Sequence, residues 1–299
     1  MKQANTVNKP FNIAKKLKEI ELFSVSCSQI SKIMIESKTA KKCDKITKLT
    51  QQISEQQGKY DAIREGLKSK DIALEKLNLL KTELKTVEET PEIRELSPSV
   101  KKYCQDWLSS RLYEKHKIFT SKYTDKGVKK EADAIVYLEQ VCDWGLAMKN
   151  DRRKTDGFIQ GECDVLLFDR VVDVKNSWDF TTFPIYEDTI PDEQYHLQVQ
   201  GYMHLYKKKK AEVCYVLMDA PDEIIRREAF FKLGRDYDYE DEQYLEFEQQ
   251  YKYSHFPKVM RVKQFEFDFD PILIETIKSR VLECRQYIDF LINKHFKNK

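Results

Sequence analysis

Two aspartates and a lysine interrupt an otherwise apolar segment near the middle of the chain. The segment from Gly161 to Lys175 has the pattern of two short strands joined by a tight turn. Because side chains alternate between the two faces of a strand, Asp164, Asp173 and Lys175 are expected on one face and aliphatic side chains on the other. One face of the strand pair would be covered by the core, and the other would carry two carboxylates beside an ammonium group. These charged groups form a candidate site for chemistry on a phosphate.

Such a pair of carboxylates favours a divalent cation. Buried carboxylates lose hydration and repel each other. Mg²⁺ relieves both effects because it takes oxygen ligands, commonly one or two carboxylates together with water and a substrate phosphate. Lys175 could then orient or deprotonate a metal-bound water, or hold a phosphate. The alternative is a surface hairpin in which the acids and Lys175 only pair with one another.

The turn between the two strands decides whether these groups share a face. We assign it to Asp169 and Arg170. Leu166 then pairs with Asp173, and Asp164 becomes a diagonal neighbour of Asp173. A turn with an odd number of residues would place the charged groups on opposite faces.

A third carboxylate is expected from a helix that precedes these strands. The apolar pattern predicts a helix over 128–148, in which Glu131 shares a core-facing stripe with Ile135 and Leu138. An acidic residue in a first helical turn is also favoured by the helix dipole alone. A site residue and a helix-stabilising residue are therefore both open interpretations of Glu131.

A helix predicted over 193–208 carries further polar candidates. Gln198 and Tyr202 lie one turn apart on one face, and Gln200 lies on another. Such side chains suit the DNA backbone or the surroundings of a metal ion, and an ordinary amphipathic helix is the alternative. Trp178, just past the lysine, is a candidate for stacking on a terminal base or for packing.

The composition limits the class of protein. The chain has 299 residues and a net charge of +2, with 41% hydrophobic and 34% charged residues, which is compatible with a sizeable core. It has no apolar run of about 18 residues and no apolar leader, which predicts a cytoplasmic protein without a membrane-spanning helix. Its seven scattered cysteines are expected to be free thiols. The lysine-rich residues 1–50 fit either a nucleic-acid surface or a solvated helical face.

Long helices mixed with strands predict an α/β or α+β fold, with a central mixed β-sheet flanked by helices. Residues 44–89 are poor in glycine and helical in period, with Gly58 and Gly66 as candidate breaks, which predicts a projecting helical hairpin or short coiled coil. Other expected elements are a short helix over 26–36, strands over 163–168, 171–174, 212–218 and 264–270, and helices over 99–112 and 271–295.

The chain resembles the PD-(D/E)xK nuclease superfamily, and within it the branch of phage lambda exonuclease and YqaJ-type viral recombinases. The resemblance covers residues 22–36 and about 98–220. It rests on four motifs in the family's order: Gly127-x-x-x-Glu131, Asp164, Asp173-Val174-Lys175 and Gln198-x-x-x-Tyr202. The start Ser26-Cys27-Ser28-Gln29 is similar to the T-A-S-R helix start of that branch, with Gln29 in place of the arginine.

This resemblance implies catalytic roles for the acidic motifs. Glu131, Asp164 and Asp173 would bind one or two Mg²⁺ ions, with Mn²⁺ as a substitute and with the Val174 carbonyl as a further ligand. Lys175 would position the attacking water. The metal would polarise the phosphate and stabilise the leaving oxygen.

The resemblance also implies the DNA contacts and the domain organisation. Ser28, Gln198, Gln200 and Tyr202 would contact DNA or support the site. The fold would be a restriction-endonuclease-like core. The expected domains are an N-terminal helix of the core over 1–43, an inserted helical hairpin or coiled coil over 44–95, and the nuclease core with its C-terminal helix over 96–299.

The function implied is that of a phage-type DNA exonuclease acting in recombination. A single-strand annealing protein and other copies of the chain are the expected partners, and no membrane is involved. Two alternatives stay open: an endonuclease of the same fold, and an inactive DNA-binding or scaffolding protein that kept the fold. The complete set of two acids and a lysine favours an active enzyme.

Overall fold

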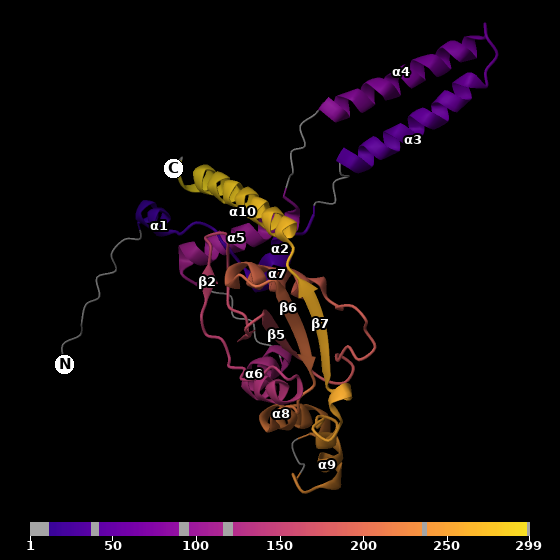
Figure 1. The fold of residues 1–299 in the computed structure, drawn as a ribbon. Helices are drawn as coiled ribbons and strands as arrows, with labels where there is room; N and C mark the ends of the chain where they lie inside the picture. Colours follow the sequence, from indigo (N-terminus) through magenta and orange to yellow (C-terminus); the bar gives the residue numbers. More distant parts are fainter. Residues whose placement is uncertain (1–11, 37–41, 90–95, 116–121, 235–237, 298–299) are drawn as a thin grey trace. The chain divides into compact units, whose positions relative to one another are not determined.

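The computed structural model describes residues 12–36, 42–89, 96–115, 122–234 and 238–297. The chain folds as two units (Figure 1). One consists of Met1–Met34 and Lys102–Lys299, and the other of Ile35–Lys101. The strands and the candidate site residues all lie in the first unit.

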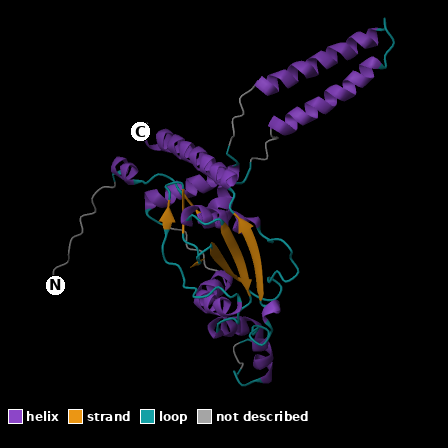
Figure 2. Ribbon diagram, in the orientation of Figure 1, coloured by secondary structure: helices purple, strands orange, loops and turns teal. Residues whose placement is uncertain are grey.

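A four-stranded mixed sheet forms the centre of the first unit (Figure 2). Its strands β5 and β6 are parallel, and the outer strands β4 and β7 each run antiparallel to their neighbour. The order is β4 (Val165–Leu166), β5 (Arg170–Asn176), β6 (Lys210–Val216) and β7 (Val262–Asp268). The predicted central mixed sheet with flanking helices is confirmed. Strands β6 and β7 each begin two residues earlier than the sequence pattern indicated.

Two helices cover the opposite faces of this sheet. Helix α6 (Lys122–Val141) packs Ala134, Ile135 and Leu138 against the aliphatic face of β4, β5 and β6. Helix α7 (Glu193–Tyr206) lies on the other face, where its Gln198 contacts β5. Because both faces are covered, β6 is buried along nearly its whole length.

A smaller three-stranded sheet joins the N-terminal segment to the core. Its order is β1 (Val25–Ser26), β3 (Ile159–Gly161) and β2 (Lys154–Thr155), with β1 parallel and β2 antiparallel to β3. A Cβ on Gly161 or on Gly201 of α7 would lie 2.8 Å from the Cys27 sulfur. Glycine at both positions therefore lets the segment after β1 pack closely on α7.

The remaining elements of the first unit are helical. The predicted helix over 26–36 is shorter in the structure, as a 3₁₀ turn η1 (Cys27–Gln29) followed by α2 (Ile30–Ile33). The others are α1 (Ile13–Glu19), α5 (Pro98–Tyr113), α8 (Asp222–Leu233), α9 (Glu242–Gln249), η2 (Lys258–Met260) and α10 (Pro271–Ile292), with a π-helical turn over Asn293–Lys297. None of the helices described is both long and apolar enough to cross a bilayer.

Two antiparallel helices make up most of the second unit, α3 (Lys42–Asp61) and α4 (Lys68–Glu89). Leu49, Ala73 and Leu77 are buried between them. The chain turns near Gly66, whose φ is +83°, whereas the other candidate break, Gly58, lies inside α3. The expected domain boundary at 43–44 falls within α3, and residues 90–95 lie outside the described residues.

We predict that removing Lys42–Glu89, with a short Gly/Ser joint, leaves a first unit that still melts cooperatively. The reason is that the apolar stripes of α3 and α4 cover each other, and Gln56 donates from Nε2 to the Ala73 carbonyl at 3.4 Å within the same pair. Circular dichroism melts and gel filtration measure the outcome. Leu77→Asp in the full chain is the matched control, because a charge at that buried position should unfold only the helix pair. Insoluble protein, or loss of the main transition in either variant, would contradict this independence.

Candidate active site

The strand pair β4–β5 carries the two aspartates, and its turn differs from the expected one. Val165 pairs with Val172, and the Leu167 N–H donates to the Arg170 carbonyl at 3.0 Å. The turn is therefore centred on Phe168 and 169, one residue earlier than predicted. The predicted pairing of residues 166 and 173 was wrong, because Leu166 pairs with Val171.

The cause of this shift lies in the neighbouring strand. Arg170 is the first residue of β5 and pairs with Lys210 of β6. Its guanidinium also lies 3.3 Å from the buried Glu212 carboxylate of the same strand. A residue held by β6 in this way cannot belong to the turn. The register moves by two residues, an even number, so the predicted sharing of one face by the charged groups is retained.

Asp164 lies just before β4, and its side chain rather than its backbone forms the hydrogen bond to β5. Its Oδ2 accepts a hydrogen bond from the Val174 N–H at 2.6 Å. Its own carbonyl accepts from the Asn150 N–H at 2.7 Å. The strand predicted over 163–168 therefore shortens to Val165–Leu166. Continuing the ladder by one residue pair places Asp164 opposite Asp173.

Asp173 is the most deeply buried acid of the site, with 1% of its surface exposed. Lys175 Nζ lies 2.7 Å from its Oδ2. Its Oδ1 accepts from Gln198 Nε2 at 2.9 Å. The ion pair with Lys175 does not have hydrogen-bond geometry, which leaves Oδ2 buried without a hydrogen bond. A cation bound at this oxygen would share it with the Lys175 ammonium.

Gln198 connects the site residues of β5 and α7. Its Nε2 also lies 2.9 Å from the Tyr202 hydroxyl, and its Oε1 accepts from Lys175 Nζ at 3.4 Å. The Lys175 ammonium also lies 4.3 Å from the centre of the Tyr195 ring. Because Gln198 and Tyr202 are buried, these contacts fix the lysine and the carboxylate relative to each other.

Gln200 and Ser28 do not join this group. Gln200 is 1% exposed, and both ends of its amide bind backbone. It donates to the Asp268 carbonyl at 2.8 Å and accepts from the Asp270 N–H at 2.9 Å, so it ties α7 to the end of β7. Ser28 is exposed on the 3₁₀ turn next to the buried Cys27, which itself packs on α7.

Glu131 lies on α6 and is paired with another residue. Its Oε1 lies 2.9 Å from Lys149 Nζ. Its charge contributes to raising the pKa values of Asp164 and Asp173, although less than burial does, so it acts on the same site. The helix was predicted over 128–148, but it spans Lys122–Val141. It ends there because Asp143 and Gly145 turn the chain at positive φ.

Burial dominates the electrostatics of the aspartates. It raises the pKa of Asp164 to about 7, with a further contribution from the charge of Asp173. Burial also raises the pKa of Asp173, partly offset by the charge of Lys175. Burial alone would lower the pKa of Lys175, but the charges of Asp173 and Asp164 outweigh it and raise this pKa. The lysine is therefore a protonated ammonium at neutral pH.

The donor set fits a hard divalent cation. Asp164 and Asp173 present carboxylate oxygens on one face, and one buried oxygen lacks a hydrogen bond. In the described part of the chain, no three His, Cys, Asp or Glu side chains already converge closely enough to hold a metal ion. For Glu131 to join the two aspartates, it would have to release Lys149.

One buried residue near the site was not indicated by the sequence. Lys126 of α6 has no exposed surface, and its Nζ donates to the carbonyls of Ser177 and Trp178 at 2.9 and 2.8 Å. Burial lowers its pKa to about 8. These carbonyls follow directly after β5. A lysine in a helix is normally predicted to be exposed, so the sequence pattern did not indicate this contact.

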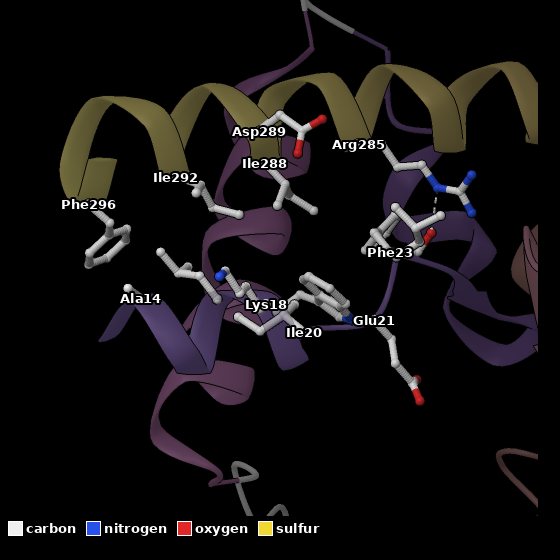
Figure 3. Close-up of a pocket in the computed structure, with 13 residues that line it drawn as sticks. Ala14, Lys18, Ile20, Glu21, Phe23, Arg285, Ile288, Asp289, Ile292 and Phe296 are labelled. Carbon is white, nitrogen blue, oxygen red and sulfur yellow. Dashed lines mark hydrogen bonds between the residues drawn. The ribbon is translucent and has the colours of Figure 1, made fainter. Parts of the chain in front are cut away.

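A separate hollow of about 570 Å³ lies between α1, α5 and α10 (Figure 3). Its wall is mainly apolar and includes Phe23, Trp107 and Ile288. Arg285 at its edge donates to the Phe23 carbonyl at 2.8 Å. None of the carboxylates discussed above lines it, so it is distinct from the candidate active site.

Comparisons with known proteins give a structural likeness only. No protein-family model matches the chain, and no curated protein matches it significantly. The chain is similar to a phage-related exonuclease from Haemophilus somnus 129PT, with a TM-score of 0.61 and 22% identity over 93% of this chain and 99% of that one. It is also similar to an alkaline exonuclease from Laribacter hongkongensis, with a TM-score of 0.49 and 12% identity over 96% and 100% of the two chains. The first likeness confirms the exonuclease-type fold that the sequence motifs indicated.

We predict that Asp164→Asn removes a pH dependence of stability in EDTA. The pKa of Asp164 is about 7 in the folded chain and about 4 in an unfolded one. The folded state thus binds this proton more tightly, and the stability that it contributes is present at low pH and lost as pH rises through 7. Thermal melts from about pH 5 to 8 should show the wild-type melting temperature falling relative to the variant.

The control for this measurement is Asp169→Asn. That carboxyl is exposed at the turn of the same hairpin and pairs with Arg170. Its variant should keep the wild-type dependence on pH. Parallel curves for wild type and Asp164→Asn would show that Asp164 titrates normally.

Proposed function

We propose that this chain is a Mg²⁺-dependent DNA nuclease that hydrolyses phosphodiester bonds, most specifically an exonuclease acting in recombination. The observation that carries the proposal is the single group formed by Asp164, Asp173, Lys175 and Gln198. Two carboxylates and a fixed ammonium on the covered face of a sheet suit a phosphate and a cation together. The fold shared with a phage-related exonuclease supports the same class of reaction.

Asp164 and Asp173 are the proposed metal ligands, with Glu131 and the Val174 carbonyl completing the set. Mn²⁺ is the proposed substitute for Mg²⁺. When bound, the ion would polarise the phosphate and lower the pKa of a bound water. The chain's own contribution is to hold the two carboxylates on one face, at a separation set by the hydrogen bond that the Val174 N–H donates to Asp164 Oδ2.

Lys175 is proposed to position the attacking water and to stabilise charge on the phosphate. Its raised pKa keeps it protonated, so it acts as a donor rather than as a general base. Asp173 and Gln198 fix the direction of the ammonium. Gln198 and Tyr202 act through these groups as positioning residues. Ser28 is proposed as an exposed contact to the DNA backbone.

The proposed partners follow from the recombination role. We propose that the chain self-associates and works with a single-strand annealing protein in the cytoplasm of the host cell. Light scattering of the purified chain tests the first of these, and co-purification with a candidate annealing protein tests the second.

The test of the function compares linear and circular duplex DNA, each with Mg²⁺ or EDTA. Loss of linear DNA only, and only with Mg²⁺, is the expected outcome. Nicking of circles would favour an endonuclease of the same fold. Absence of any Mg²⁺-dependent loss, with DNA binding retained, would favour a scaffolding protein.

We predict that Asp173→Asn reduces hydrolysis by at least a hundredfold while the fold is retained. The amide keeps the size of the side chain but removes a charge that a cation and Lys175 both need. A cooperative melt in EDTA checks that the fold is retained, because the variant loses the repulsion from Asp164 and also leaves the Lys175 ammonium without its partner. Asp169→Asn, on the same hairpin, should keep wild-type rates. Wild-type activity in Asp173→Asn would refute the site.

We also predict that Lys175→Ala loses most hydrolysis but still binds Mg²⁺, because the proposed ligands are oxygens. Lys175→Arg should not restore activity, since a planar guanidinium cannot replace a compact ammonium between Asp173 and Gln198. Calorimetric titration with Mg²⁺ and rates on linear duplex measure the two properties separately. A near-normal rate in either variant would exclude the proposed role of the lysine.

A further inference from the structure

The loop over 177–192 joins the two elements that carry the active-site group. It begins two residues after Lys175 of β5 and leads into α7, which carries Gln198. It contains no helix or strand. Loops of this length without secondary structure are uncommon in a compact domain and are usually functional.

This loop is held rigidly at its start. Lys126 of α6 donates hydrogen bonds to the carbonyls of Ser177 and Trp178. Asp179 Oδ1 accepts from the N–H groups of Thr181 and Thr182 at 3.0 and 3.1 Å. The turn is thus fixed by its own side chains and by a buried lysine, whose desolvation is itself unfavourable.

The four aromatic side chains of this loop differ in exposure, and Tyr186, near its middle, is 91% exposed. Trp178 is 8% exposed and packs edge-on against Tyr251, and Phe183 is 5% exposed. Phe180 lies between them on the turn and is 69% exposed. The sequence pointed to Trp178 as a candidate for base stacking, but its ring belongs to the core. Of the two exposed rings, Phe180 lies within the turn that Asp179 holds and is nearer to Lys175 along the chain than Tyr186.

We propose that Phe180 is a stacking platform for an unpaired base of the DNA substrate, within about five nucleotides of the phosphate at Lys175. The proposal rests on the proposed nuclease function and adds a substrate contact to it. Five residues of chain span at most about 17 Å, which is about five stacked nucleotides at ~3.4 Å each. A ring carried on a turn whose backbone is already ordered loses less conformational entropy on binding than one on an unordered segment. Stacking accepts any base, as an enzyme that degrades DNA of varied sequence requires.

The test measures affinity for two DNA duplexes that differ in their bases alone. Each has a short single-stranded end, and in one of them the unpaired nucleotides are abasic. Fluorescence anisotropy is read with Ca²⁺ in place of Mg²⁺ to suppress hydrolysis. The wild type should bind the base-containing end roughly five- to hundredfold more tightly than the abasic one, the range expected for one stacked base.

Phe180→Ala should lose this preference, and Phe180→Tyr should keep it. Phe231→Ala is the matched control, because that ring is 75% exposed on α8. The stacking contact is overturned if Phe180→Ala keeps the full preference, or if Phe231→Ala loses it equally. A wild-type protein that binds both ends equally also overturns the contact but leaves the nuclease proposal intact. A wild-type protein that binds neither end overturns the nuclease proposal together with the contact.

Discussion

The burial of Asp173 is the constraint on which the rest of the site depends. A carboxylate with almost no exposed surface is unfavourable unless other groups compensate its charge. Lys175 supplies the opposite charge from the same strand, and Gln198 supplies a hydrogen bond from α7. The hydrogen bond from Gln198 requires β5 and α7 to meet at one fixed position. The placement of the helix over the sheet is therefore set by polar as well as apolar groups.

Buried polar groups also define the ends of this region. Gln200 ties α7 to the end of β7 through two backbone hydrogen bonds. Lys126 of α6 binds the chain as it leaves β5. Gln200 and Lys126 each fix the position of a segment that apolar packing alone would allow to shift. Strand β5, which carries Asp173 and Lys175, is thereby held at both faces and at its C-terminal end.

The sequence determined the face of the charged residues but not their register. Because side chains alternate along a strand, the sequence places Asp164, Asp173 and Lys175 on the same face of the sheet. A change of register by an even number of residues keeps them on that face. The turn could not be placed, because Arg170 is held by Glu212 of β6, which is distant in sequence. The pairing of Gln198 with Tyr202 followed from helical spacing. The inward direction of Lys126 did not, since it depends on two carbonyls some fifty residues away.

Exposure was the other property that the sequence could not determine. Trp178 and Phe180 are both aromatic and lie two residues apart, but Trp178 packs against Tyr251, which is distant in sequence, whereas Phe180 is exposed. The same holds for Gln200. Its position in the helical pattern does not indicate burial, but its amide forms hydrogen bonds with the backbone of Asp268 and Asp270, just before α10. Long-range contacts of this kind separate a residue that holds the fold from one that can meet a substrate.

The repulsion between Asp164 and Asp173 follows from the same geometry that keeps them on one face. Their raised pKa values mean that the folded chain disfavours the form in which both are ionised. A group that binds only the folded state stabilises it, and more so the more tightly it binds, so a cation bound between these carboxylates would offset the repulsion. The two acids can stay adjacent because the aliphatic face of the same strands, packed against α6, supplies stability that does not depend on their charge. Burial on one face of β5 thus permits an unfavourable charge arrangement on the other.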